Sequence, residues 1–410
     1  MRQTLKNAGL TTAVLVLALA AAEGVLRLAG ISYPQWYKED AALGGALRPG
    51  ARGRFEKEGS AWVEINSAGM RDREHSVTKP PGVFRIAVLG DSFAEAMQVE
   101  RDRAFWAVLE RRLRGCAWLG GREPEVLNFG VSGYGTAQEL IALRTRVWQY
   151  DPDLVLLAFF TGNDLRNNSR ALNGEAGVPY FVLKDGRLVE DDSFREHLAA
   201  VDTGGPARSI RSLLASARNH LRLLQLATQA RAAFGRHRAS LREPGAVETR
   251  AATGGEPGVD NEIYAPPRDA RWREAWDVTE ALIAAMRDEV RARGKQFLLA
   301  TLSTGIQVHP DSAVRRAFSV RLGIQDLYYP DRRLAAVAAR EGIPAVTLAP
   351  EMAAWAEANG AFLHGFPNSV EGFGHWNETG NALAGELIAA RICGGAPLPA
   401  QGQVHNTDKR

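Results

Sequence analysis

The sequence predicts an α/β protein whose parallel sheet is covered by helices on both faces. Its strand-like runs are almost uniformly apolar, and helical patterns lie between most of them. A strand buried on both faces is apolar throughout, whereas a strand with one wet face alternates. The chain is also long and apolar enough for a large core, with 410 residues of which 45% are hydrophobic. Together these observations indicate βα units in one parallel sheet.

Five runs are predicted as strands and five longer patterns as helices. The clearest helix is 272–293, because its apolar residues recur at helical spacing and Gly294 follows as a stop. The predicted strands are FRIAVLG at 84–90, EVLNFG at 125–130, LVLLAFF at 154–160, QFLLATL at 296–302 and AVTLA at 345–349. The predicted helices cover 102–114, 135–149, 272–293, 331–341 and 378–393.

The first residues have the pattern of an export signal. Arg2 and Lys6 precede a mostly apolar run from 8 to 22, and the small residues that end this run fit a cleavage site. Cleavage would give a secreted protein. A helix that continues uncleaved past Glu23 would instead make residues 1–31 a signal-anchor in the inner membrane, the interpretation we favour. Both interpretations place the rest of the chain outside the cytoplasm, on the periplasmic side.

Two segments interrupt the α/β rhythm. Residues 32–82 form an N-terminal extension, and residues 164–271 form an insertion longer than a crossover needs. The insertion contains a predicted hairpin turning at Asp185-Gly186, a helical stretch at 208–235 and a polar Gly/Pro-rich loop at 242–261. Insertions in such sheets commonly sit above the strand ends, so this one could form a wall or lid for a site. The remaining divisions are 83–163 and 272–394 for the two parts of the α/β domain and 395–410 for a disordered tail.

Charge and residue spacing exclude several classes of function. The net charge is only +3, and the basic residues are scattered among acidic ones, so no surface for nucleic acid is predicted. The 8 histidines are dispersed without the spacing of metal ligands. We therefore expect no metal, no cofactor and no nucleic-acid partner.

Ser92 stands where the first predicted strand ends and a helical run begins. In VLGDSFAEAMQV the serine follows Gly90 and Asp91 directly. Parallel sheets bind ligands at the carboxyl ends of their strands, and backbone N–H groups at a helix start can stabilise a developing anion. By itself, however, this serine could simply be the N-cap of the helix.

Three more chemically suitable residues follow later in the predicted sheet. Gly133 in NFGVSGYGTAQ could offer an unobstructed N–H, and Asn163 in FFTGNDLRNN could offer a side-chain amide. His375 in GHWNETG stands just before the last helix. Because the carboxyl ends of parallel strands meet at one edge, we expect these residues to converge with Ser92 on one crevice.

This set of residues resembles the markers of the SGNH (GDSL-type) serine hydrolase family. The four marker residues match Ser92, Gly133, Asn163 and His375, and the matched blocks extend from about residue 84 to 393. The resemblance implies a flavodoxin-like three-layer α/β/α sandwich with a five-stranded parallel sheet, here with the large insertion after the third strand. It also implies a serine esterase without metal or cofactor. His375 would remove the Ser92 proton, and the N–H groups of Ser92 and Gly133 with the Asn163 amide would hold the oxyanion.

The sequence departs from the family pattern at two positions. The family usually has an acidic residue three positions before its histidine, and that position is Gly372 here. Glu371 could orient His375 from a bent loop; otherwise the site would work as a Ser–His dyad with a backbone carbonyl holding the ring. The glycine expected two positions before Asn163 is Thr161, which we expect to change only the local turn.

The implied fold also bears on the two cysteines. In a flavodoxin-like sandwich the helix after the first strand and the last helix lie side by side and point the same way. Cys116 and Cys393 stand near the ends of these helices, so a disulfide between them is expected, with Cα atoms within about 7 Å. Two free buried thiols are the alternative.

The resulting functional prediction is a serine esterase that acts on an ester-bearing small molecule or glycan. The most plausible substrate is an O-acetyl group on a cell-envelope or exported polysaccharide, with the membrane as a partner through the N-terminal helix. Two alternatives stay open. One is an O-acyltransferase that passes the acyl group to a sugar hydroxyl, and the other is a non-catalytic envelope binding or assembly protein.

Overall fold

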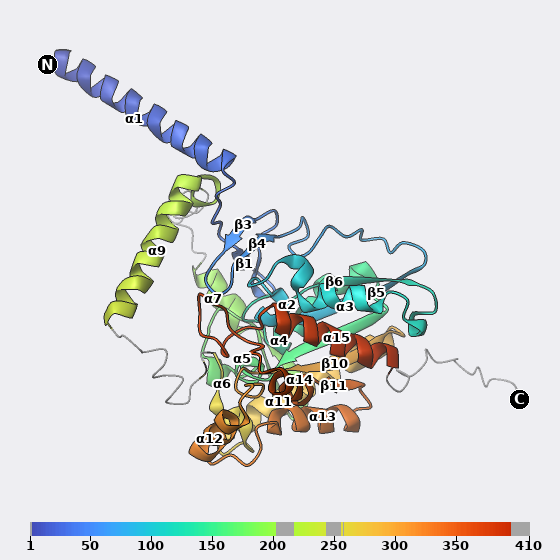
Figure 1. The fold of residues 1–410 in the computed structure, drawn as a ribbon. Coiled ribbons are helices and arrows are strands. Elements are labelled where there is room, and N and C mark those ends of the chain that lie inside the picture. The colour runs from blue at the N-terminus through green and yellow to red at the C-terminus, as the bar shows by residue number, and fades with distance from the viewer. Residues whose placement is uncertain (1, 202–216, 243–255, 257, 395–410) are drawn as a thin grey trace, which may run out of the picture.

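The computed structural model describes residues 2–201, 217–242, 256 and 258–394, and its centre is a five-stranded parallel sheet (Figure 1). The strand order is β6-β5-β7-β10-β11. In chain order this is 2-1-3-4-5, the flavodoxin-like order, so the predicted fold class is confirmed. The strands are β5 (Val83–Gly90), β6 (Glu123–Asn128), β7 (Leu154–Phe160), β10 (Gln296–Leu302) and β11 (Ala345–Thr347).

Alternate residues of each strand point into opposite helical layers. In β5, Ile86 and Val88 face one hydrophobic cluster, whereas Ala87 and Leu89 face the other. Both faces of the sheet are therefore shielded from water, which explains why the strands are apolar throughout. The layer on the Ile86 side contains α3 (Phe105–Leu113), α14 (Leu348–Asn359) and α15 (Glu378–Gly394). The opposite layer contains α4 (Thr136–Ala142), α11 (Ala270–Ala292) and α13 (Tyr329–Arg340).

Most predicted elements are present, with shifted ends. The helix predicted over 135–149 consists of α4, a π-helical turn at Leu143–Val147 and a 3-10 turn at Trp148–Tyr150. The last predicted strand ends at Thr347 because α14 begins at the next residue. Neither α14 nor α12 (Ser312–Leu322) was predicted from the sequence. Both add to the helical layers without changing the sheet.

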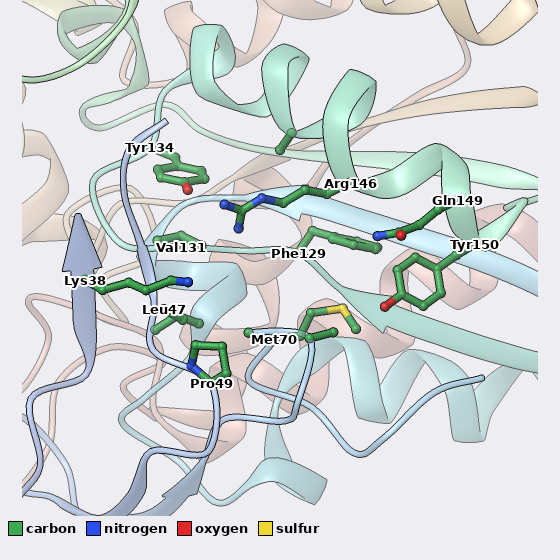
Figure 2. Close-up of a pocket in the computed structure, with 13 residues that line it drawn as sticks. Lys38, Leu47, Pro49, Met70, Phe129, Val131, Tyr134, Arg146, Gln149 and Tyr150 are labelled. Carbon is green, nitrogen blue, oxygen red and sulfur yellow. The ribbon is translucent and has the colours of Figure 1, made fainter. Parts of the chain in front are cut away.

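The N-terminal extension folds onto the sheet domain as two small antiparallel hairpins. They are β1 (Tyr37–Asp40) with β2 (Gly44–Leu47), and β3 (Arg52–Phe55) with β4 (Ala61–Glu64). Trp36, Leu43, Val63 and Met70 from this segment belong to the hydrophobic cluster that covers the Leu89 face of the sheet. The extension is therefore part of the same core. A small cavity of about 200 Å³ remains between it and the segment after α4, bordered by Leu47, Met70, Phe129, Arg146 and Tyr150 (Figure 2).

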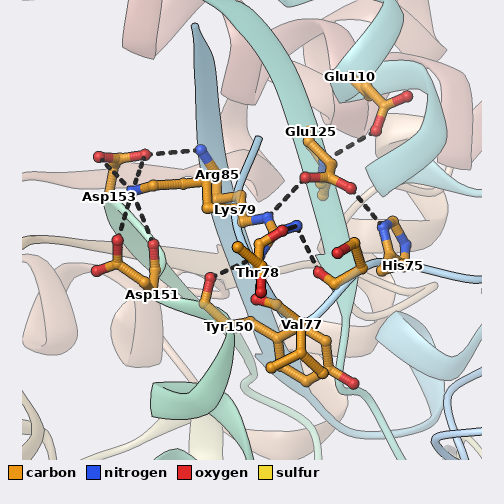
Figure 3. Close-up of polar contacts among 12 residues, drawn as sticks. His75, Val77, Thr78, Lys79, Arg85, Glu110, Glu125, Tyr150, Asp151 and Asp153 are labelled. Atoms are coloured by element: carbon orange, nitrogen blue, oxygen red, sulfur yellow. Dashed lines mark hydrogen bonds and ion pairs between the residues drawn. The ribbon is translucent and has the colours of Figure 1, made fainter. Parts of the chain in front are cut away.

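A buried polar network fixes the end of the extension at the amino ends of the strands (Figure 3). Arg85 of β5 is fully buried and pairs with Glu125 of β6 at 2.6 Å, while it also donates to the carbonyl of Val77 at 2.9 Å. Lys79 pairs with Asp153 at 3.2 Å. Because a buried guanidinium is costly without partners, this network holds the extension in one position against the sheet.

The insertion follows β7 and begins with short helical turns. The hairpin predicted at Asp185-Gly186 is present, and both turn residues have positive φ (51° and 74°), as a two-residue hairpin turn requires. Its elements are α5 (Asp164–Asn167), α6 (Arg170–Asn173), β8 (Tyr180–Lys184), β9 (Arg187–Asp191), α7 (Ser193–Val201) and α9 (Arg222–Arg242).

Some sequence predictions fall on segments that lie outside the described residues. These are the start of the helical stretch predicted at 208–235, most of the polar loop predicted at 242–261, and the tail predicted at 395–410. The remainder of the helical stretch is present, since α9 covers 222–235.

The two cysteines form a disulfide. The Cα atoms of Cys116 and Cys393 lie 5.7 Å apart, within the expected limit, and the described residues contain no free cysteine. Helices α3 and α15 pack against each other, as the fold implied. Cys116 lies in a turn beyond Leu113 rather than at the last residue of α3.

The N-terminal helix α1 (Arg2–Leu28) projects away from the sheet domain (Figure 1). Within the described residues it is the one helix long and apolar enough to cross a membrane, over Gln3–Leu28. At 1.5 Å per residue, twenty of its residues match a hydrocarbon core of about 30 Å.

Candidate active site

Ser92, His375 and Glu58 form a continuous chain of hydrogen bonds. Ser92 Oγ lies 2.8 Å from His375 Nε2, and His375 Nδ1 lies 2.5 Å from Glu58 Oε2. The other carboxylate oxygen of Glu58 accepts the backbone N–H of His375 at 2.9 Å. A hydroxyl, an imidazole and a carboxylate in this order have the arrangement of a nucleophile, its base and the group that orients the base.

Ser92 is the first residue of the short helix α2 (Ser92–Glu95), and the N-cap is Asp91. Asp91 Oδ1 accepts the N–H of Phe93 at 2.9 Å, as an N-cap side chain does. The alternative in which Ser92 merely caps the helix is therefore wrong, and its hydroxyl is directed to His375. Burial raises the pKa of Asp91 to about 6.

Glu58 comes from the turn between β3 and β4, far from His375 in the sequence. Asn368 holds this turn, because its Oδ1 accepts the N–H of Gly59 at 2.8 Å and its Nδ2 donates to the Gly59 carbonyl at 2.7 Å. Gly374 leaves the space for the carboxylate. Its φ is +85°, and an added Cβ would lie 2.2 Å from Glu58 Oε1. Only glycine at 374 allows Glu58 to reach both the ring and the backbone of His375.

The loop that carries His375 is supported from below by His364. His364 Nδ1 lies 2.6 Å from the Gly374 carbonyl, and its Nε2 lies 3.0 Å from Ser303 Oγ. Burial lowers the pKa of His364 to about 4, so the ring is neutral, with Nδ1–H donating to the carbonyl and Nε2 accepting from the hydroxyl. Trp376 Nε1 completes the set by donating to Ser303 Oγ at 2.9 Å. His364 thus supports the loop that carries His375.

The environment of His375 favours its protonated form. Burial lowers the pKa of the ring, but the hydrogen bond and charge of Glu58 outweigh burial, so the pKa is raised above its ordinary value. For Glu58, burial raises the pKa, but the hydrogen bonds and charge of His375 outweigh burial, so the pKa is lowered below its ordinary value. The Phe93 ring packs on the imidazole with centroids 4.9 Å apart. The pair is therefore an oriented imidazole beside a carboxylate that stays charged.

Glu371, the acid suggested by the sequence, does not occupy this place. Its side chain is exposed, and the carboxylate at His375 Nδ1 is that of Glu58. A dyad held by a backbone carbonyl is not present either. Position 372 is a glycine with φ +85° in a tight loop, so the chain there cannot present an acid in the family manner.

Gly133 is brought to the nucleophile by the loop after β6. The N–H of Val131 donates to the Gly90 carbonyl at 3.1 Å, which ties this loop to the segment just before Ser92. At Gly130 an added Cβ would lie 2.5 Å from the Ala94 side chain, so the loop passes directly over α2. Gly133 has φ +81° and borders the same cavity as His375 and Glu58.

Asn163 stands at the carboxyl end of β7, the strand next to β5. Gly90 is in register with Ala158, so the residues that follow each strand, Ser92 and Asn163, leave the same edge of the sheet. Asp164 braces the loop by accepting the N–H of Phe160 at 2.8 Å. Thr161 is buried and its hydroxyl donates to the Leu302 carbonyl at 3.2 Å, so the departure at this position is accommodated.

A cavity of about 590 Å³ opens at His375 and Gly133. The extension provides much of its wall, including aromatic side chains and the charged side chains of Lys57 and Glu58. Glu95 adds a buried carboxyl that accepts from Tyr37 Oη at 2.9 Å and from Ser132 Oγ, and burial raises its pKa to about 7. The principal lining residues are Trp36, Tyr37, Phe55, Lys57, Glu58, Glu95, Met97, Ser132, Gly133, Tyr134 and His375.

Glu256, a residue of the insertion, supports the loop that carries His375. The carboxylate of Glu256 accepts the N–H groups of Gly305 at 3.0 Å, Ile306 at 3.3 Å and Gly374 at 3.3 Å. Burial raises its pKa to about 7, although these hydrogen bonds oppose the shift. Glu256 thereby ties the His375 loop to the end of β10. Within the described ranges no group of His, Cys, Asp or Glu side chains could hold a metal ion.

Comparisons with known proteins found similar solved structures but no matching sequence. No protein-family model and no curated protein sequence matches the chain. Solved structures similar to it include a variant of an acetyl xylan esterase from Geobacillus stearothermophilus (11% identity, 77% of this chain, 97% of that chain, TM-score 0.35). They also include a lipase/acylhydrolase from Enterococcus faecalis (14% identity, 77% and 98%, TM-score 0.35) and a lipolytic protein of the G-D-S-L family from Desulfitobacterium hafniense (12% identity, 75% and 98%, TM-score 0.32). Similarity at this level assigns no activity, so the functional argument rests on the site itself.

The sequence analysis missed two residues that hold the site together, Glu58 and Asn368. They are 310 positions apart in the chain, and nothing in the spacing of either residue links it to the four blocks. The one available signal was indirect. A glycine at 372 left the histidine without its acid, and the glycine at 374 left room for a carboxylate from elsewhere.

Proposed function

We propose that the protein is a membrane-anchored extracytoplasmic serine esterase that forms an acyl intermediate on Ser92. The observation that carries the proposal is the Ser92–His375–Glu58 chain, with distances of 2.8 and 2.5 Å. A hydroxyl with an oriented base at hydrogen-bond distance is arranged for nucleophilic attack on an acyl carbon. The site residues Ser92, His375, Gly133 and Asn163 are those named from the sequence, and Glu58 replaces Glu371 as the orienting acid.

The first step is attack of Ser92 Oγ on the ester carbonyl. His375 Nε2 accepts the hydroxyl proton as the bond forms. Nε2 must therefore be unprotonated beforehand, so the N–H hydrogen of the neutral ring is on Nδ1. Glu58 accepts that hydrogen, fixes the tautomer and stabilises the imidazolium that develops. His375 then returns the proton to the leaving alcohol, and a water molecule releases the acyl group by the reverse sequence.

The negative charge that develops on the carbonyl oxygen needs donors at the sheet edge. The N–H of Ser92 at the start of α2, the N–H of Gly133 and the side-chain amide of Asn163 are the three donors we assign to it. Donors that the fold holds in place stabilise such a charge without reorganising during the reaction, and one donor typically contributes about 10²- to 10³-fold in rate.

For the substrate we propose an O-acetyl group on a cell-envelope or exported glycan. A cavity of about 590 Å³ has room for one or more sugar rings beside the acyl group. Its aromatic side chains, Trp36, Tyr37 and Phe55, stand beside hydroxyl, amide and carboxylate groups, a lining that suits a polar molecule with flat apolar faces. The same space would admit an acceptor sugar, so an O-acyltransferase that uses the same acyl-Ser92 is the second candidate.

The test combines hydrolysis with covalent labelling of the full-length protein. Wild type is expected to release acetate from p-nitrophenyl acetate and from an acetylated oligosaccharide, and a fluorophosphonate probe is expected to label Ser92. Ser92→Ala and His375→Ala should each lower kcat/KM by at least about 10⁴-fold, because the nucleophile and base act as a unit. Ser67→Ala, which removes a surface hydroxyl of the extension, is the matched control and should keep full activity.

The outcomes separate the three candidate functions. Turnover that rises on addition of a deacetylated glycan, with acetate recovered on that glycan, assigns the transferase. Turnover to free acetate alone assigns the esterase. If wild type is inert on both substrates and Ser92 is not labelled, the catalytic proposal is wrong and the non-catalytic binding or assembly protein takes its place.

A further inference from the structure

Helix α9 of the insertion (Arg222–Arg242) combines arginines with exposed apolar side chains. Its residues read RLLQLATQARAAFGRHRASLR, which contains five arginines and no acidic residue. Large apolar side chains on it are exposed, including Phe234 at 66% and Leu224 at 41%. A helix that combines exposed apolar side chains with arginines and no acids is typical of one that lies in the interface of a lipid bilayer.

One face of α9 gathers these side chains. Leu224, Ala227, Arg231, Phe234 and Arg238 are spaced by three or four residues, so they lie on one side of the helix, and all are exposed. Gln225, which points the opposite way, is buried at 2% exposure, and its Oε1 accepts the N–H of Tyr33 at 2.9 Å. The helix therefore packs on the extension with one side and presents an apolar and basic side to its surroundings.

The start of α9 is fixed to the end of α1. The carboxylate of Glu23 accepts the N–H groups of Arg222 and Leu223, both at 3.0 Å, and so satisfies the first turn of α9. Arg27 joins the contact by pairing with Glu23 at 2.8 Å and donating to the His220 carbonyl at 2.5 Å. Figure 1 shows α9 starting beside this end of α1 and running in a different direction.

The position of Glu23 in α1 sets the level of α9 relative to a membrane. Twenty residues from Gln3 to Ala22 are enough to cross the hydrocarbon core, so Glu23 follows directly at the level of the headgroups. A helix capped by Glu23 must then begin in the same headgroup region. Its two described outward arginines would face lipid phosphates, for which the guanidinium group is well suited.

We propose that α9 is an interfacial helix that binds the anionic phospholipid surface beside α1. The proposal rests on α1 being the membrane anchor of the proposed function. Its consequence is an orientation of the domain. The inner side of α9, at Gln225 and Gln229, borders a cavity of about 430 Å³ that shares Trp36 and Phe55 with the active-site cavity. The active-site cavity and the membrane surface would therefore lie on either side of Trp36 and Phe55.

The experiment uses full-length protein with Phe234→Cys, labelled with the environment-sensitive dye NBD and reconstituted into nanodiscs. The native cysteines are joined in a disulfide, so the introduced thiol is the site of labelling. Phosphatidylcholine discs are compared with discs that also contain phosphatidylglycerol, each with and without nitroxide-labelled lipid. Gln229→Cys, half-buried on the inner side of the same helix, is the matched control.

The dye at position 234 is expected to shift to the blue and to be quenched by nitroxide lipid, more strongly with phosphatidylglycerol, whereas the dye at 229 is not. Each arginine near an anionic surface strengthens association about fivefold, so Arg231→Glu with Arg238→Glu should abolish the phosphatidylglycerol dependence. Equal quenching at 234 and 229, or none at 234, overturns the inference. A blue shift at 234 in detergent that grows with protein concentration also overturns it, because a second copy then covers this face.

Failure of the anchor is recognised separately. If alkaline carbonate extracts the wild-type protein from membranes, α1 is not an anchor and the placement of α9 is overturned with it. If the protein resists extraction but position 234 meets no lipid, the anchor stands and the inference about α9 alone is wrong.

Discussion

The N-terminal extension and the insertion are both additions to the same sheet, yet they serve the site in different ways. The extension supplies Glu58, whose carboxylate bonds the ring of His375 at 2.5 Å. The larger insertion supplies Glu256, which bonds main-chain N–H groups, among them that of Gly374, and does not touch the ring. A small segment that precedes the sheet therefore completes the Ser92–His375 chain of hydrogen bonds, while the insertion supports the backbone of the His375 loop and lines the cavity with Glu175 and Val178.

The difference reflects what each role requires of the fold. A nucleophile and the donors for an oxyanion must stand at a sheet edge, and that edge is built by the strands themselves. The orienting acid needs only to reach one ring nitrogen, and any loop that passes His375 can bring it there. The same role can therefore move to an added segment, provided that this segment is held as firmly as the sheet.

Among changes in the two added segments, the largest effect is expected from Glu58→Gln. The amide cannot stabilise the imidazolium or fix the tautomer as a carboxylate does, so kcat/KM on p-nitrophenyl acetate should fall by about 10²- to 10⁴-fold. His375 acts as a base only when neutral, and Glu58 holds its pKa above the ordinary value. Wild-type activity is therefore lost as the pH falls through that raised pKa, and in the variant the loss should occur at lower pH.

Glu371→Gln is the matched control for this comparison, because Glu371 is the exposed acid on the His375 loop. It should retain both the rate and the pH profile of wild type. If Glu371→Gln loses activity while Glu58→Gln keeps it, the extension does not complete the site, and the comparison between the two added segments fails.

The fold could be predicted largely because its signal is local. The strand β7 reads LVLLAFF, and both helical layers need apolar partners at every position of such a strand. Elements without a strong period were missed. Helix α14 starts at the residue after β11, so the apolar pattern of its first turn continues that of the strand. The four short strands of the extension have too few residues for an alternating pattern.

The site could be predicted in part for the same reason. Ser92, Gly133 and Asn163 each follow a strand, and strand order decides which ends meet. Glu58 follows no strand of that sheet, and 317 positions separate it from His375. Its placement depends on how the turn after β3 docks against the loop at Asn368, which is a tertiary contact that neither segment's own sequence encodes.

That docking contact is the basis of the second prediction. Asn368→Ala removes the acceptor for the Gly59 N–H and the donor for the Gly59 carbonyl, so the Glu58 turn loses its clamp. Because small displacements of an orienting group reduce catalysis steeply, kcat/KM should fall by about tenfold. A positioning role also requires the acidic limb of the pH profile to move part of the way towards that of Glu58→Gln, which a merely destabilised protein would not show.

The control for Asn368 is Asn359→Ala, since the Asn359 amide donates within its own helix to the Trp355 carbonyl at 2.8 Å. It should leave the profile unchanged. An Asn368→Ala protein with the full rate and profile would mean that the turn holds Glu58 without the clamp. The extension would then be rigid enough to place Glu58 without a contact from the Asn368 loop.

The smallest effect on activity is expected from Glu256→Gln, and its clearest effect should be on stability. Burial raises the pKa of Glu256 to about 7 in the folded protein, above its ordinary value of 4.5. The folded state therefore holds the proton more tightly, so the stability from this group is complete below about pH 4.5 and is lost as the pH rises to about 7. Glutamine resembles the protonated form and does not titrate. The thermal midpoint of the variant should therefore rise relative to that of wild type as the pH increases from about 4.5 to about 7.

The same variant decides whether the two added segments differ in kind. Glu256 bonds the backbone one residue before His375 rather than its ring, so kcat/KM should change by less than about threefold, compared with 10²-fold or more for Glu58→Gln. Glu262→Gln, a change of an exposed acid in the same insertion, is the control and should alter neither quantity. If Glu256→Gln lowers kcat/KM as far as Glu58→Gln does, the insertion also belongs to the catalytic machinery. A carboxylate beneath the loop would then contribute as much as the one on the ring, because the position of the Gly374 backbone would itself determine where the imidazole stands.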